Sequence, residues 1–437
     1  MNCFSSKPLL SRIACLLFLS AVCTPALAGT LTLEAALATA QAAHPDLLLA
    51  QAERDSALAD LDIANSREDT SINLEGILRS GRPSTSTLGP GFVGDNSVRL
   101  TARKTLYDFG RSSNAELAAR FELKAREADL TTTLDRRRLE IMARYFDVLL
   151  ADMQYTEDNE LMAVYYVNFD QAKERLAQGL ISRIEVAELE SRYHDILEKR
   201  NASAQRQQIT RAMLANAMNR PGDLPSDLED PKLPGNQRAL PDYETLLPVL
   251  LDNNPRLHAQ QEMLAASQKR MESLRAENGP TLDAEVQAAD YDRTAATRDS
   301  LSAGLILSWP LYQGSRSDSR VAREMAQFNK LQASTEKLKM DLTQALLETC
   351  LEITQLQSTS RGAAQKYTEY RDLQLERSRG LYELEMKSNL GTSMVETSDA
   401  NLRARRNEYR LALSFARLEA LLGKPLSETA TIKGKGK

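Results

Sequence analysis

The sequence contains few of the residues on which catalytic and metal sites are usually built. Among 437 residues there are 3 histidines, 4 cysteines and 1 tryptophan. The histidines, His44, His194 and His258, lie at unrelated spacings, so paired metal ligands at helical spacing are missing. The sequence has no Gly-rich phosphate loop, nucleophile elbow or other catalytic motif. We therefore expect no enzyme activity, no metal site and no cofactor.

The chain also lacks an excess of basic charge and, beyond its first residues, any long apolar run. Lys plus Arg number 55 against 60 Asp plus Glu, a net charge of −5. A nucleic-acid-binding protein would show a clustered basic excess, so this class is not indicated. The missing apolar runs exclude a bundle of membrane-spanning helices. Ala, Leu, Glu, Gln and Arg are abundant, which is typical of long polar helices.

The N-terminus has the pattern of a secretory signal. Lys7 and Arg12 precede an apolar run over 13–22, and Ala-Leu-Ala follows at 26–28. This order of charged, apolar and small residues predicts export and cleavage of residues 1–28. An uncleaved anchor is the alternative, but the apolar run is too short for it. Cleavage leaves Cys350 as the one remaining cysteine, so no disulfide framework can form.

The rest of the chain repeats itself once. The helical pattern after His-Pro at 44–45 returns after Asn-Pro at 254–255, and LYDFGR at 106–111 is matched by LYQGSR at 311–316. Spacings of roughly two hundred residues indicate duplication of a whole domain. We expect a first repeat over 29–219, a Pro- and Gly-rich linker over 220–242, a second repeat over 243–425 and a polar tail over 426–437.

Two stretches in each repeat alternate between apolar and polar residues. This period of two predicts β-strands over about 68–80 and 96–107, and over about 280–291 and 299–312. Lys104 interrupts the alternation in the first repeat. Strands of about ten residues can cross a bilayer at a tilt. A soluble four-stranded sheet is the alternative that the strands alone leave open.

Very long helices follow each pair of strands. Residues 111–178 contain no proline or glycine, and apolar residues recur there every seven positions, as in a coiled coil. At about 1.5 Å per residue, such a helix is about 100 Å long. Residues 315–382 form a similar run, and shorter helices return over 183–218 and 395–422. An exported protein with such strands and rods is expected to bridge an outer membrane and the periplasm.

Four strands are too few to close a transmembrane barrel. Such a barrel needs at least about eight strands, and an open strand edge in lipid leaves backbone groups unpaired. Other copies of the chain must therefore complete it. Two copies give a barrel filled by its own side chains, whereas three give an aqueous lumen, so we expect three or more copies.

The duplicated plan, the LYDFGR and LYQGSR junctions and the helix-tip segments resemble the TolC family of outer membrane factors. The resemblance covers nearly the whole mature chain. Its most specific segment is GTSMVETSDA at 391–400, which is similar to the family's Gly-Thr…Val-Asp-Val-Leu-Asp-Ala with one residue fewer after Gly-Thr; GLISRIEVAE at 179–188 is the counterpart in the first repeat. The resemblance implies an α plus membrane β-barrel fold. Four strands per chain would complete a twelve-stranded barrel in a homotrimer, continued by a long periplasmic α-helical barrel.

The resemblance places acidic rings at the periplasmic aperture of this barrel. Glu396 and Asp399 match the family's paired acids, with Glu185 and Glu188 at the first-repeat tip. Acids three residues apart share a helix face, and rings of carboxylates select cations. A solvated acidic face is the alternative.

The tips are expected to turn at Gly179 and Gly391. Ser388 and Ser393 stand where the best-known member has a gating Tyr and a gating Arg, so a closed state held by those partners does not carry over. Tyr107, Trp309 and Tyr312 end their strands, which predicts an aromatic girdle at the membrane boundary, with ordinary packing as the alternative.

The implied function is a passive exit duct in the cell outer membrane, extending into the periplasm of a Gram-negative bacterium. It would serve a tripartite efflux pump or a type I secretion system. Its partners would be a periplasmic adaptor, an inner-membrane RND or ABC transporter and outer membrane lipid. The alternative is a periplasmic coiled-coil adaptor or structural protein without a pore. The sequence does not distinguish drug, metal ion or polypeptide as cargo.

Overall fold

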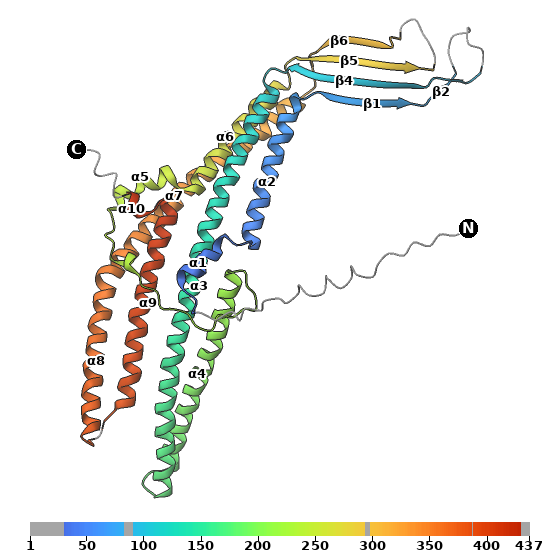
Figure 1. The fold of residues 1–437 in the computed structure, drawn as a ribbon. Coiled ribbons are helices and arrows are strands. Elements are labelled where there is room, and N and C mark those ends of the chain that lie inside the picture. Colours follow the sequence, from blue (N-terminus) through green and yellow to red (C-terminus); the bar gives the residue numbers. More distant parts are fainter. Residues whose placement is uncertain (1–29, 83–90, 293–297, 387, 430–437) are drawn as a thin grey trace, which may run out of the picture.

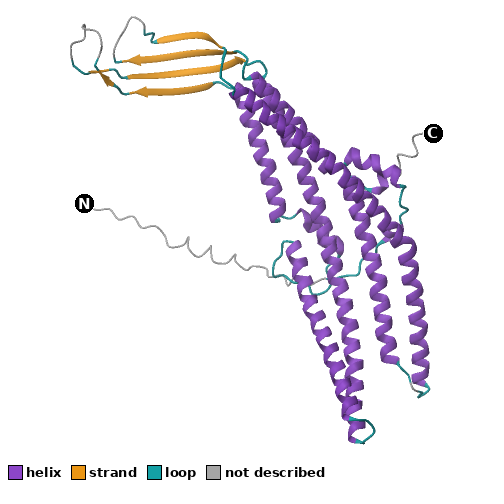
Figure 2. Ribbon diagram, turned by 180° about the vertical axis from the view of Figure 1, so that it is seen from behind, coloured by secondary structure: helices purple, strands orange, loops and turns teal. Residues whose placement is uncertain are grey.

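The computed structural model describes residues 30–82, 91–292, 298–386 and 388–429, so the predicted signal at 1–28 lies outside the described part. The molecule is elongated. A sheet projects from one end of a helical body, and the other end divides into two hairpin tips (Figure 1). Figure 2 shows that the long strands lie in the sheet and all long helices lie in the body.

The helical body is built from both repeats. The first supplies α1 (Leu33–Ala38), η1 (Thr39–Gln41), α2 (Pro45–Asn65), η2 (Ser66–Glu68), α3 (Arg111–Ala177) and α4 (Arg183–Ala217). The second supplies α5 (Tyr243–Asn253), α6 (Pro255–Ala276), α7 (Arg316–Gln355), η5 (Leu356–Ser360), α8 (Arg361–Glu383) and α9 (Leu390–Leu422). The turn η4 (Pro234–Gln237) lies in the linker and α10 (Leu426–Thr429) at the start of the expected tail. Among the described residues, no helix combines the length and apolar character needed to cross a membrane.

The same local signal starts the lead-in helix of each repeat. His44 Nδ1 accepts a hydrogen bond from Asp46 N (3.2 Å), and Asn254 Oδ1 accepts one from Leu257 N (3.0 Å). In both helices proline follows the capping residue, where its missing N–H costs nothing. The duplicated sequence therefore folds into duplicated helix starts.

The sheet is antiparallel and combines the two repeats. Its order is β1 (Ser71–Ile77), β4 (Ser97–Tyr107), β5 (Thr281–Tyr291) and β6 (Leu301–Ser308), and a short ladder pairs β2 (Ser80–Gly81) with β3 (Val93–Gly94). The central pairing joins β4 of the first repeat to β5 of the second. β6 ends short of the expected boundary at 312 because Pro310 has no N–H to donate to a ladder.

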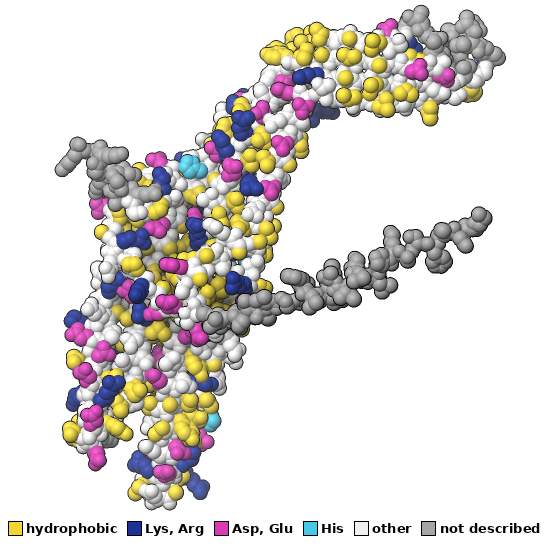
Figure 3. Space-filling model, viewed as in Figure 1, with side chains coloured by type: hydrophobic (Ala, Val, Ile, Leu, Met, Phe, Trp, Pro, Cys, Tyr) yellow, Lys and Arg dark blue, Asp and Glu magenta, His cyan; other side chains and the backbone are white. Residues whose placement is uncertain are grey.

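One face of the sheet is apolar and the other is polar. Leu74, Leu100 and Leu301 share one row across the strands, and their exposed fractions are 72%, 46% and 70%. On the opposite face, Arg99 lies 3.3 Å from Glu75, and Arg103 pairs with Glu285. Hydrophobic side chains cover the sheet surface that faces the viewer in Figure 3. The apolar face therefore needs a cover that this chain does not supply within its described residues.

Lys104 follows the alternation onto the apolar face, at the end of β4 next to the helices. A β-bulge between Thr105 and Tyr107 then shifts the register. Beyond the bulge, Phe109 and Gly110 take positive φ values of 58° and 83° and turn the chain into α3. Glycine adopts this left-handed conformation without steric cost.

α3 is the central helix, 67 residues long. It packs against α2 and α6 toward the sheet and against α4 and α9 toward the tips (Figure 1). Of its seven-spaced apolar residues, Ile141 and Val148 are fully buried. The coiled-coil pattern therefore faces other helices of the same chain.

Two apolar clusters hold the body together. The first includes Ile141, Phe146, Leu214 and Tyr409; the second includes Leu246, Leu346, Cys350, Leu411 and Phe415. The rings of Phe146 and Tyr409 stack with centroids 4.5 Å apart, which joins α3 to α9. Cys350 is buried as a small apolar side chain. The second cluster lies almost entirely within the second repeat, whereas the first joins α9 of the second repeat to α3 and α4 of the first.

The inter-repeat linker is fixed to the body by the first described residues. Leu31 N donates to Asp227 O (2.9 Å), and Glu229 N donates to Leu31 O (3.0 Å). The Tyr145 hydroxyl lies 2.7 Å from Leu31 O and 2.6 Å from Glu229 O. The linker thus crosses α3 as an ordered strap.

Candidate aperture at the helix tips

The four acidic residues singled out by the sequence lie near the free ends of the two hairpins. Glu185 and Glu188 lie in the first two turns of α4, and Glu396 and Asp399 lie in the second and third turns of α9. Charged side chains of both signs surround the tips in Figure 3. The acids are therefore not isolated negative charges, and their partners decide what they can do.

Glu185 forms part of the cap that starts α4. Ser182 Oγ accepts a hydrogen bond from Glu185 N (3.2 Å), and Glu185 Oε2 accepts one from Ser182 N (2.7 Å). The backbone hydrogen bond from Ser182 lowers the pKa of the Glu185 carboxyl. The Ser-x-x-Glu spacing at 182–185 is the sequence signal of this capping box, which our aperture interpretation overlooked. Gly179, with φ +72°, makes the turn just before it.

Glu188 pairs with Arg192 one helical turn later on α4. Both side chains are 58% exposed. Such a pair contributes little to stability. It does, however, place a positive charge beside the Glu188 carboxylate.

Glu396 is paired with an arginine of the facing helix. Arg371 Nη1 on α8 donates to Glu396 Oε2 at 2.6 Å. The Arg371 guanidinium also lies over the rings of Tyr367 and Tyr370, at 5.0 and 5.2 Å from their centres. Sequence analysis missed Arg371 because its partner lies 25 residues away on another helix.

Asp399 has its own arginine. Arg403 Nε lies 3.0 and 2.9 Å from the two carboxylate oxygens of Asp399. The Tyr367 hydroxyl donates to Asp399 Oδ2 at 3.4 Å, and the Arg403 guanidinium lies 5.1 Å from the Tyr367 ring centre. The spacing of four between Asp399 and Arg403 could have been found in the sequence.

A cavity lined by both charged and apolar side chains connects Asp399 to the first repeat. It has a volume of about 430 Å³ and is lined by α3, α4 and α9, including Glu157, Asp158, Lys199, Arg206, Asp399 and Arg406. Burial and the charge of Asp399 raise the pKa of Glu157. Lys199 Nζ lies 2.8 Å from Asp158. The two hairpins therefore meet through charged groups at this level.

Gly391 lies in the first turn of α9 and not in the tip turn where the sequence placed it. A Cβ atom added to Gly391 would lie 2.8 Å from Val164 Cγ2 on α3. Glycine is thus needed for a close approach of two helices. Ser398 Oγ donates to Glu160 at 2.7 Å and strengthens the same contact between α9 and α3.

Ser388 and Ser393 face inward within their own hairpin. Ser393 Oγ lies 2.7 Å from Ser378 Oγ, and Ser388 Oγ donates to Ser378 O at 2.6 Å. Ser393 is 2% exposed. These hydroxyls connect α8, the turn and the start of α9.

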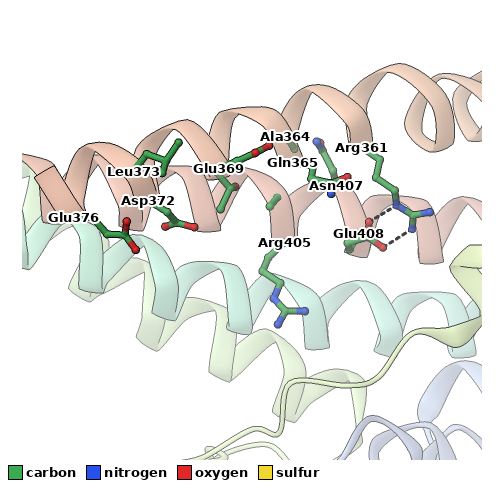
Figure 4. A pocket seen from close by; sticks show the side chains of 12 residues that line it. Arg361, Ala364, Gln365, Glu369, Asp372, Leu373, Glu376, Arg405, Asn407 and Glu408 are labelled. Atoms are coloured by element: carbon green, nitrogen blue, oxygen red, sulfur yellow. Dashed lines mark hydrogen bonds and ion pairs between the residues drawn. The ribbon is translucent and has the colours of Figure 1, made fainter.

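A groove runs between α8 and α9 away from the tip (Figure 4). Its volume is about 600 Å³, and Glu369, Asp372 and Glu376 lie along its α8 side. At one end, Arg361 donates two hydrogen bonds of 2.7 Å to Glu408, and these bonds lower the pKa of Glu408. The groove therefore runs along the hairpin from Arg361 to Glu376, which lies nearer the tip than Arg371.

The predicted boundary aromatics lie at the junction of sheet and helices. Tyr107 ends β4 and packs against Phe109, with ring centres 5.1 Å apart. Trp309 and Tyr312 follow β6, and their exposed fractions are 61% and 90%. The chain itself thus covers part of the Tyr107 side chain and little of the Trp309 and Tyr312 side chains.

One known protein family matches this chain. The outer membrane efflux protein family matches residues 36–220 and 246–424, which is most of the chain and both repeats. The chain belongs to the outer membrane efflux protein family. This membership confirms the predicted duplication, the predicted resemblance to TolC-like outer membrane factors and the predicted location in the outer membrane. No curated protein sequence matches the chain.

Solved outer membrane proteins share the fold of this family member. The outer membrane channel CmeC of Campylobacter jejuni has a TM-score of 0.73 at 14% identity, over 92% of this chain and 88% of CmeC. VceC of Vibrio cholerae has a TM-score of 0.71 at 16% identity, over 90% of this chain and 96% of VceC. The outer membrane channel MtrE of Neisseria gonorrhoeae, in its open state, has a TM-score of 0.67 at 16% identity, over 90% and 89% of the two chains. At these identities the likeness shows the fold.

Proposed function

We propose that three copies of this outer membrane efflux protein form a passive exit duct. The duct conducts substrates from the periplasm or cytoplasm to the exterior, as part of a tripartite efflux pump or a type I secretion system. The observation that carries the proposal is the uncovered apolar face of an open four-stranded sheet mounted on long helical hairpins. An open sheet in lipid has to be closed by further copies.

The two faces of the sheet fit a barrel wall. Three sheets in a ring would give about twelve strands, enough for an aqueous lumen. The row with Leu74, Leu100 and Leu301 would face lipid, and the pairs Arg99–Glu75 and Arg103–Glu285 would line the lumen. Trp309 and Tyr312 would then lie at the membrane boundary, where aromatic girdles occur.

The helical hairpins would continue this wall through the periplasm. Glu396 and Asp399 would lie at the narrow end, with Glu188 on the neighbouring tip, while Glu185 caps α4. Drive and cargo would come from a periplasmic adaptor and an inner-membrane RND or ABC transporter. The duct itself would catalyse no reaction.

One purification tests the proposal. The mature chain extracted from outer membranes in detergent is expected to have the mass of a trimer and to give discrete conductance steps in planar bilayers. A monodisperse, water-soluble monomer without conductance would contradict the duct and favour the alternative of a coiled-coil adaptor without a pore. Light scattering and single-channel recording distinguish these results.

A further inference from the structure

Glu396 and Asp399 at the proposed aperture are each paired with an arginine of their own chain. Glu396 has Arg371 at 2.6 Å, and Asp399 has Arg403 at 2.9 Å. Each pair joins two full charges of opposite sign at hydrogen-bond distance. The field of such a pair falls off more steeply than that of a lone carboxylate, so a ring of pairs attracts cations less than a bare ring.

Burial and two aromatic rings hold the Arg371 guanidinium beside Glu396. Its side chain is 19% exposed, and it stacks on Tyr367 and Tyr370. Its Nε is buried and has no hydrogen-bond partner among the described atoms. Arginine tolerates such stacking because its guanidinium is weakly hydrated and always charged. The charge therefore stays beside Glu396 and is not free to move into solvent.

Arg403 is placed by the same tyrosine. Its guanidinium lies 5.1 Å from the centre of the Tyr367 ring, and the Tyr367 hydroxyl donates to Asp399. Tyr367 thus contacts both arginines and one acid. The formal charges of these two pairs, Arg371–Glu396 and Arg403–Asp399, cancel.

We propose that Arg371 and Arg403 determine the ion selectivity of the channel by compensating the charges of Glu396 and Asp399. The wild-type aperture then discriminates weakly between cations and anions. This inference rests on the proposed function, because it requires these pairs to line the narrow end of a duct. It changes the expectation for acidic rings: here the arginines decide whether the rings act.

The test is the ratio of K⁺ to Cl⁻ permeability, measured from reversal potentials in planar bilayers under a KCl gradient. Wild type is expected to give a ratio close to unity. Arg371→Met with Arg403→Met should raise the ratio several-fold, because it exposes rings of unpaired carboxylates. Glu396→Gln with Asp399→Asn should lower the ratio below unity, because it leaves the arginines unpaired.

The variant with all four substitutions should return the ratio to the wild-type value. Arg361→Met is the matched control, because Arg361 forms an equally short pair with Glu408 on the same hairpin but away from the tip. It should leave the ratio unchanged. Trimer mass and unitary conductance are measured for every variant.

The variant Glu396→Gln with Asp399→Asn tests the proposal even if the arginine variants fail to assemble. Bare acidic rings would make its ratio fall from a cation-selective value toward unity, whereas compensated rings make it pass below unity. A strongly cation-selective wild type, or arginine variants with the wild-type ratio, would overturn the inference. If wild type forms no channel at all, the proposed function fails instead.

Discussion

Ser378 on α8 and Ser393 on α9 share a buried hydrogen bond, with their hydroxyl oxygens 2.7 Å apart. Ser388, in the turn, donates to the backbone carbonyl of Ser378. The resemblance to TolC-like factors puts a gating Tyr and Arg at Ser388 and Ser393. In this chain the side chains at the same two positions form hydrogen bonds within the α8–α9 hairpin.

Substitutions at Ser393 test how much these hydrogen bonds stabilise the hairpin. Ser393→Ala should cost about 1 kcal/mol of stability by removing one buried hydrogen bond. Ser393→Arg should be far more disruptive, because it introduces a long charged side chain at a site that is 2% exposed. Hydrogen exchange of the segment 376–397 measures both effects, with Ser358→Ala, at an exposed hydroxyl, as the control. An arginine variant with wild-type protection would show that Ser393 is not confined.

Gly391→Ala should destabilise the contact between α9 and α3. The added Cβ would lie 2.8 Å from Val164 Cγ2, and overpacking of this kind costs about 1–3 kcal/mol. Gly380→Ala on α8 meets nothing within 4 Å and should be neutral or slightly stabilising. Thermal unfolding in detergent measures the difference. Combining Gly391→Ala with Val164→Ala should recover part of the loss, and a failure to do so would locate the strain elsewhere.

Glu157→Gln should stabilise the protein at neutral pH. Burial and the charge of Asp399 raise the pKa of Glu157 above its ordinary value of 4.5 in the folded chain. The stability that this group contributes is therefore complete below pH 4.5 and is lost as pH rises through the folded pKa. As pH rises from 4.5 to neutral, the melting temperature of Glu157→Gln should increase relative to that of wild type. The difference between Glu174→Gln, an exposed site on the same helix, and wild type should stay constant. Parallel curves for Glu157→Gln would contradict the prediction.

Lysine substitutions at adjacent strand positions distinguish the two faces of the sheet. Leu100→Lys places a charge on the apolar face, and its cost should rise with depth in the bilayer, up to about 2–4 kcal/mol at the midplane. Thr101→Lys places the same charge on the polar face and should be tolerated. The amount of assembled protein in outer membranes measures both. Equal amounts for the two variants would argue against a lipid-facing row.

Regular elements were predictable because their signals are local. The absence of proline and glycine over 111–178 predicted α3 almost to its ends at Arg111 and Ala177. Alternation around Leu74 and Leu100 predicted the strands and their apolar face. Pro310 is a local signal for the end of β6, and the Ser-x-x-Glu spacing is a local signal for the cap of α4.

The partners at the tip could not be predicted because they depend on how α8 meets α9. Arg371 reaches Glu396 across an antiparallel hairpin, and no spacing rule connects residues 25 positions apart. Gly179 and Gly391 illustrate the same limit. Both are glycines near a tip, but the first makes a turn with positive φ, while the second admits a neighbouring helix.

The π-helical turn η5 makes the two halves of the duplicated chain unequal. α3 runs without interruption, whereas η5 separates α7 from α8 in the second repeat. A π-turn accommodates one extra residue within a continuous helical run. The long arm of the second repeat therefore carries a local change of helix geometry that α3 lacks. In a ring of six hairpins made from three such chains, hairpins of the first and second repeat would alternate. The narrow end of the ring would therefore have threefold and not sixfold symmetry.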